Sequence, residues 1–327
     1  MVNNGSSILW ILALLCLLVA PGLLGGESAI FSAFVLIATF AVMAYGLDVI
    51  VSDLGEVSLT HPVFFAAGAY ATAIASSRYN FDPASTLVLT IVVSLAIAAL
   101  ISLVTLNLRE FVFSLVTYAV TVVSMTIAAN WAFLGGSDGV TGIPVFRLFG
   151  YTAGTDKTLW PIAWGLLALT IYVIGAFRRS ALGQAAMTVH LNPRLATMSG
   201  IDPRLVRIKV FMVSAPITAT AGWLYAYQRA YVSADVLDMY FLILSLTAVV
   251  LVGRRMLAAP LLGVALILLQ EKFLSFGAYY DRIILGGVLI VVLSFLPRGL
   301  AGLFGDAGRL ILRRKKALAY IPQDLET

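Results

Sequence analysis

Few residues of this 327-residue chain could do covalent or metal chemistry. There are two histidines, His61 and His190, and neither has a cysteine or an acid at ligand spacing. The one cysteine, Cys16, lies in an apolar run and is expected to pack rather than react. None of the five lysines follows Gly in the Gly-Lys-Ser/Thr pattern that binds nucleotide phosphates. The sequence therefore predicts no metal centre, no ATPase site and no enzyme activity.

The acidic residues could couple transport to an ion gradient only if one lay at membrane depth. Asp48, Glu110 and Glu271 stand near the ends of apolar runs, and no two carboxylates are expected to face each other inside one. We expect helix-end positions for Asp48 and Glu271, although either could reach a pathway. A source of energy outside the chain is favoured, and an ion-coupled secondary carrier acting alone is the alternative.

Small uncharged polar residues inside the apolar runs are expected mainly to pack helices. Asn130 is harder to explain in this way, because a buried amide needs hydrogen-bond partners and because it precedes a Gly-rich loop by one turn. A pathway lined by such groups would suit a neutral or zwitterionic solute.

The composition requires a membrane. Hydrophobic residues make up 61% of the chain, charged residues 11%, and the mean hydropathy is +1.00. A soluble domain has about 25% charged residues. In lipid the backbone must satisfy its own hydrogen bonds, and continuous apolar runs of about 20 residues do so as helices. The fold class predicted is therefore an all-α integral membrane protein.

Ten segments are long and apolar enough to be helices, the third and eighth being short for a full span. The first is expected to be a retained helix, since no Lys or Arg precedes it. The ten segments are Ile8–Leu24, Ile30–Ile50, Pro62–Ser77, Ala84–Leu106, Phe111–Phe133, Thr158–Phe177, Ile208–Gln228, Tyr240–Val252, Ala258–Phe276 and Arg282–Leu296.

Lys and Arg set the orientation, because cytoplasmic loops carry an excess of them. With ten crossings and a cytoplasmic N-terminus, 15 basic residues fall on the cytoplasmic side and 6 on the outer side. Both termini are therefore predicted to be cytoplasmic. Residues 1–297 form the predicted transmembrane domain, and 298–327 form a basic cytoplasmic tail.

Two loops of this domain are long. Residues 134–157 form an outer loop, and residues 178–207 form a cytoplasmic loop with internal order. Ser180 is expected to cap a short helix that ends at Asn192-Pro193, and Gly200 to close a second helical turn. Asp202-Pro203 reads as the start of the next span. Such a loop could dock a partner protein.

Five blocks of the sequence, in order and at the expected spacing, resemble one family. Ser58–Ala73 reads SLTHPVFFAAGAYATA, Gly135–Pro144 reads GGSDGVTGIP, and Leu296–Gly302 reads LPRGLAG. The other two blocks are Ser180–Ala226, which carries Gly200-Ile201-Asp202, and Val249–Leu262. The chain resembles the second permease of branched-chain amino acid ABC importers over nearly its full length.

The resemblance implies the ten-helix class of ABC importer permeases, working in the bacterial inner membrane. It implies a second related permease, two cytoplasmic ATPase subunits that hold ATP and Mg, and a periplasmic solute-binding protein docking near Gly135–Lys157 and Tyr231–Asp238. No cofactor in this chain and no nucleic acid are expected. Residues 180–200 would be the coupling loop.

The candidate site residues follow from this reading. Those expected to contact the ATPase are Gln184, Met187, His190, Pro193 and Arg194. Those expected on the translocation path are Phe64, Phe65, Thr117 and Asn130.

Several positions depart from the family pattern. Gln184 and Met187 stand where the family has arginines, Pro193 and Thr197 where it has acids, and Asp48 where it has asparagine. The solute could therefore be a branched-chain or other hydrophobic amino acid, or else urea, a short amide or an aromatic acid.

Overall fold

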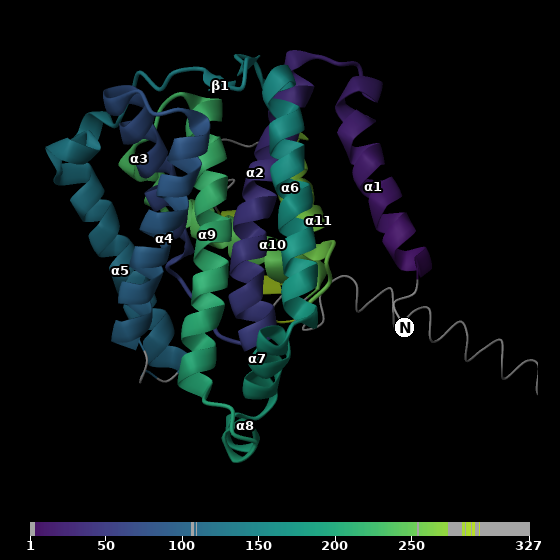
Figure 1. Cartoon of the computed structure of the whole chain (residues 1–327), viewed down its shortest axis with the longest axis vertical. Helices are drawn as coiled ribbons and strands as arrows, with labels where there is room; N and C mark the ends of the chain where they lie inside the picture. The colour runs from purple at the N-terminus through teal and green to yellow at the C-terminus, as the bar shows by residue number, and fades with distance from the viewer. Residues whose placement is uncertain are drawn as a thin grey trace, which may run out of the picture.

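The computed structural model describes residues 4–105, 108, 110–253, 255–273 and eight positions between 283 and 294. About half of the tenth expected segment and the whole basic tail, residues 298–327, lie outside the described residues. Helices dominate the described part (Figure 1). The expectation of a purely α-helical chain is wrong in one detail, because the loop 134–157 contains a small antiparallel hairpin of β1 (Phe146–Leu148) and β2 (Tyr151–Ala153).

The long helices match the expected segments to within a few residues. They are α1 (Asn4–Leu23), α2 (Ser28–Asp48), α3 (His61–Tyr79), α4 (Pro83–Thr105), α5 (Glu110–Asn130), α6 (Asp156–Arg179), α9 (Pro203–Arg229), α10 (Met239–Val252) and α11 (Ala259–Phe273). Shorter elements join them: α7 (Ala181–Leu191), α8 (Pro193–Met198), a π-helix η1 (Val49–Leu54), and 3-10 turns η2 (Ala132–Leu134), η3 (Gly136–Asp138) and η4 (Ala234–Leu237).

Within the described residues, five helical stretches are long and apolar enough to cross a membrane, so the protein is multi-pass. They are Ser28–Leu54, Pro83–Thr105, Phe111–Asn130, Asp156–Arg179 and Pro203–Arg229. The expected eighth segment is short, with 14 residues in α10. The expected third is longer than predicted, because α3 starts at His61 and continues to Tyr79.

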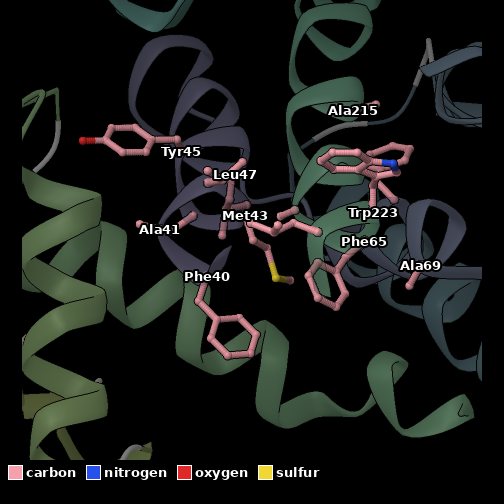
Figure 2. Packing of buried hydrophobic residues seen from close by; sticks show 14 of the residues in the cluster. Phe40, Ala41, Met43, Tyr45, Leu47, Phe65, Ala69, Ala215 and Trp223 are labelled. Carbon is pink, nitrogen blue, oxygen red and sulfur yellow. The ribbon is translucent and has the colours of Figure 1, made fainter. Parts of the chain in front are cut away.

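Helix α2 forms the centre of the bundle. Its most apolar window is 89% buried, and it contacts α6, α9, α10 and α11. Figure 2 shows Phe40 and Met43 of α2 pointing toward Phe65 of α3, and the rings of Phe40 and Phe65 stack with centroids 6.2 Å apart. A helix covered on all sides reads as apolar on all faces, which is why its sequence has no amphipathic stripe.

Helices α3 and α9 approach each other most closely through glycines. A Cβ atom added to Gly68 would lie 2.0 Å from the carbonyl oxygen of Ala219, and one added to Gly222 would lie 1.9 Å from that of Phe65. Small residues at such crossings let backbones meet, which is how helices associate in lipid.

The substitution Gly68→Ala should therefore destabilise the protein by about 1–3 kcal/mol, because the added methyl group overpacks the crossing. Thermal unfolding in detergent measures this. Gly165→Ala on α6 is the matched control, since nothing lies within 4 Å of its Cβ position. Equal melting temperatures for the two variants would contradict the close α3–α9 crossing.

The bundle has two distinct ends (Figure 1). Helices α7 and α8 project from one end, and the β1–β2 hairpin covers the other. Helices α1 and α5 lie at opposite edges.

Candidate functional site

The loop between α6 and α9 is built by three helix N-caps, of which the sequence predicted those at Ser180 and Asp202, while Asn192 was expected only to end α7. The Ser180 hydroxyl accepts from the Gly183 N–H at 3.2 Å and starts α7. The Asn192 side chain accepts from the N–H groups of Arg194 and Leu195 and starts α8. Asp202 accepts from the Arg204 N–H at 2.9 Å and starts α9. Gly200 has a φ of +79°, the left-handed conformation expected after a helix end.

All five residues expected to contact an ATPase lie on this loop. Gln184, His190, Pro193 and Arg194 are exposed, and Met187 is half-buried. The imidazole of His190 packs against Gly55, where an added Cβ would fall within 1.5 Å of Nδ1. Four of the five are therefore available to another protein, and His190 also contacts the segment that follows η1.

The tip of the loop carries exposed apolar side chains that the sequence analysis did not single out. Leu191 is 71% exposed, Leu195 55% and Met198 86%. They are close in sequence on α7 and α8, which project farthest from the bundle (Figure 1). Large exposed apolar patches on a surface mark sites of protein or membrane contact.

A buried ion cluster lies where α6 meets the end of α2. Arg178 Nη2 donates to Asp48 Oδ2 at 2.6 Å, and Arg178 Nε donates to Asp53 Oδ2 at 3.0 Å. Arg255 Nε lies 3.0 Å from Asp53 Oδ1. The Asp48 and Asp53 side chains are no more than 1% exposed. The expectation that no two carboxylates come together at an apolar run is wrong, because Arg178 supplies the charge that lets both acids be buried.

A second ion pair lies at the other end of the same loop. Arg207, in the first turns of α9, donates from Nε to Glu56 Oε1 at 2.7 Å. The Arg207 guanidinium also lies over the ring of Phe113 on α5, 5.8 Å from its centroid. Arg178 and Arg207 thus tie both ends of the loop to one stretch of chain, Asp48–Glu56.

The chain between η1 and α3 forms no regular helix or strand, and half of its side chains are buried. In Gly55–Thr60, the side chains of Glu56, Ser58 and Thr60 are buried. Hydroxyl groups of α5 form hydrogen bonds with the backbone of this segment. Ser114 donates to the Val57 carbonyl at 2.7 Å, and Thr121 donates to the Leu59 carbonyl at 2.7 Å. Thr117 Oγ1 accepts from the Leu59 N–H at 3.2 Å. In lipid an irregular backbone persists only with such partners.

The four expected pathway residues lie in different surroundings. Phe64 and Phe65 are fully buried, with Phe64 against Phe211 and Phe65 against Tyr225 and Phe241. Thr117 is also fully buried. Asn130 is exposed at the end of α5, and its amide donates to the Thr126 carbonyl at 2.8 Å.

An apolar cavity of about 620 Å³ lies between the C-terminal half of α5 and helices α3 and α4. Its lining includes Tyr70 and Ile74 of α3, Val93 of α4, Ile127 of α5, and Trp131, which directly follows α5. Within the described chain α5 contacts chiefly the short turns η4 and η3, and only 22% of its most apolar window is buried.

The family model for the permease component of the branched-chain amino acid transport system matches residues 29–293. The chain belongs to this family. The match spans the central helix, the ion cluster and the α7–α8 loop. The protein is therefore a permease subunit of an ABC importer and a multi-pass membrane protein, as the sequence predicted.

Several curated proteins are similar over much or part of the chain. The high-affinity branched-chain amino acid transport permease LivM of Salmonella typhimurium is 25% identical, over 91% of this chain and 76% of its own length. LivM of Escherichia coli has the same identity and coverage. BraD of Pseudomonas aeruginosa is 27% identical over 42% of this chain and 44% of its own length. No solved structure matches the chain significantly.

Removing Arg178 should destabilise the folded protein strongly. Arg178→Ala leaves Asp48 and Asp53 buried with less positive charge, and losing one partner of a buried pair costs about 3–5 kcal/mol. Arg179→Ala is the matched control, because the neighbouring arginine is exposed and should change stability by no more than about 0.5 kcal/mol. Thermal unfolding of both variants in detergent distinguishes them, and a wild-type melting temperature for Arg178→Ala would refute the structural role of the cluster.

Proposed function

We propose that this chain is one of two related permeases in an ATP-driven importer of the bacterial inner membrane, and that an ATPase subunit docks on its α7–α8 loop. The observation that carries this proposal is the exposed apolar tip, Leu191, Leu195 and Met198, beside Arg194. Apolar groups surrounded by polar ones are the usual centre of a protein interface. The ATPase pair would hold ATP and Mg, and this chain would form half of the pathway.

The distribution of charge supports a cytoplasmic location for this tip. Arg178, Arg179, Arg194, Arg204 and Arg207 all lie at or near the α7–α8 end of the bundle (Figure 1). This excess is what the positive-inside rule gives for a cytoplasmic face. Ten spans with both termini on that face satisfy the rule for the whole sequence.

The opposite end offers a docking surface for a solute-binding protein. The two segments expected to form it, 135–157 and 231–238, are joined by a β-bridge between Val140 and Val232, with N···O distances of 2.7 and 3.1 Å. Two loops held together in this way present one continuous surface.

The solute class follows from the relatives and from the uncharged residues near the expected path. A branched-chain or other hydrophobic amino acid fits the branched-chain amino acid transport of the LivM proteins. Phe64, Phe65, Thr117 and Asn130 stay our candidates for the path. Urea, short amides and aromatic acids are the alternatives, and titrating the cognate solute-binding protein with each class by calorimetry decides among them.

The docking proposal predicts that charge at the tip of the loop breaks assembly. Leu195→Asp with Met198→Asp should reduce ATPase co-purification at least about tenfold, because a buried unpaired charge costs more than the roughly 1.4 kcal/mol that tenfold requires. Combining His190→Glu with Arg194→Glu should also abolish substrate-stimulated ATPase activity.

Thr152→Asp, at an exposed position in β2 at the opposite end, is the control and should leave the complex intact. Full assembly and full stimulation in the α7–α8 variants would refute docking at this loop. Uptake by the purified chain alone, driven by an ion gradient in proteoliposomes, would instead establish the secondary carrier.

A further inference from the structure

We infer that Ser114, Thr117 and Thr121 of α5 are positioning residues that transmit movement of the α7–α8 loop to α5 through the irregular segment Gly55–Thr60. This inference rests on the proposed docking of an ATPase at α7–α8. The segment Gly55–Thr60 would then serve to transmit movement between the loop and α5.

The first link joins the loop to the segment. The α7–α8 loop begins after Arg178 and ends before Arg207, and these two arginines pair with Asp48, Asp53 and Glu56. Each ion pair has charged groups that are largely buried, with side-chain exposures of 17% or less. Separating such pairs is costly, so the loop cannot shift without pulling on residues 48–56.

A third contact lies between these two anchors. His190, on α7, packs its ring against Gly55, which has a φ of +79°. A left-handed φ is strained for a residue with a Cβ, and a Cβ here would also overlap the ring. The turn after η1 is therefore in direct contact with the helix that carries the docking residues.

The second link joins the segment to α5. Ser114, Thr117 and Thr121 are spaced by three and four residues, so they lie on one face of the helix. Their hydroxyls contact the backbone of Val57 and Leu59 through the three hydrogen bonds described above. Backbone groups in an apolar setting keep their partners, so α5 must follow the segment or lose these bonds.

The N-terminal half of α5 also contacts Arg207, the arginine that pairs with Glu56. Phe113 is fully buried, lies edge-on to Phe211 of α9 with ring centroids 5.8 Å apart, and lies beneath the Arg207 guanidinium. The residue that pairs with Glu56 therefore also touches α5. Both connections act on the same end of the helix.

The remainder of α5 is free enough to respond. Its outer half borders the apolar cavity of about 620 Å³, and most of its surface is uncovered within the described chain. Its other contacts are mainly with the short turns η3 and η4. A helix bordered by a cavity and by short turns can tilt with less repacking than a helix that is close-packed against other helices. Movement of the loop would thus become a tilt of α5 relative to α3 and α4.

The test is a split between ATP hydrolysis and uptake in the full complex. Thr121→Val keeps side-chain volume nearly constant and removes the hydroxyl that donates to the Leu59 carbonyl, while Thr117, a candidate for the path, is left unchanged. Reconstituted with the ATPases, the second permease and the solute-binding protein, this variant should hydrolyse ATP at near the wild-type rate. Uptake per ATP should fall about tenfold, within the range typical of coupling between distant sites.

Two further variants separate this role from ordinary packing. Thr121→Ser restores the hydroxyl and should recover uptake per ATP. Thr126→Val on the same helix is the control, because the Thr126 hydroxyl donates only within α5, to the Val122 carbonyl at 3.0 Å. If the Thr121→Val variant folds poorly, Ser114→Ala, which removes the hydroxyl that donates to the Val57 carbonyl, should still lower uptake per ATP.

The possible failures are distinguishable. Wild-type permease that does not bind the ATPases refutes the proposed function itself. Normal assembly with an unchanged ratio of uptake to hydrolysis in the valine and alanine variants refutes only the transmission through α5. A serine variant that stays as uncoupled as the valine variant also refutes it, because hydroxyl bonding would then not be the cause.

Discussion

The pairing of Arg178 with Asp48 and Asp53 is the interaction on which the α7–α8 end of the structure depends. It places a positive charge beside two buried carboxylates at the end of the most deeply buried helix, where an unpaired charge would be costly. It also fixes the end of α6 against α2, and α6 leads directly into the α7–α8 loop. The position and orientation of that loop follow from this one cluster together with the Arg207–Glu56 pair.

Different interactions hold the two ends of the molecule together. At the α7–α8 end, charge is paired and buried, and the exposed surface combines apolar and basic side chains. At the hairpin end, backbone pairing between loops dominates, through β1 with β2 and Val140 with Val232. This polarity fits a permease subunit whose opposite faces meet different partners.

Between the ends, the packing is uneven. Helices α2, α3 and α9 meet through glycines and aromatic rings with almost no free volume, as at Gly68, Gly222 and Phe65. The N-terminal half of helix α5 instead contacts the bundle through hydroxyl groups, and its C-terminal half borders a cavity. Alternating access in transporters involves movement of one group of helices against another, and a tightly packed core beside a less covered helix is compatible with such movement.

The sequence by itself determined the membrane class, most helix limits and two caps of the α7–α8 loop. These are local properties: apolar run length, and Ser180 and Asp202 each accepting a hydrogen bond from an N–H two or three residues onward. The family blocks were also read directly from the chain. Tertiary structure alone decided that Asp48 and Asp53 meet Arg178, more than 120 residues away, and that Thr117 bonds to Leu59. No local pattern encodes these contacts, because they depend on which faces of distant helices come together once lipid has excluded water.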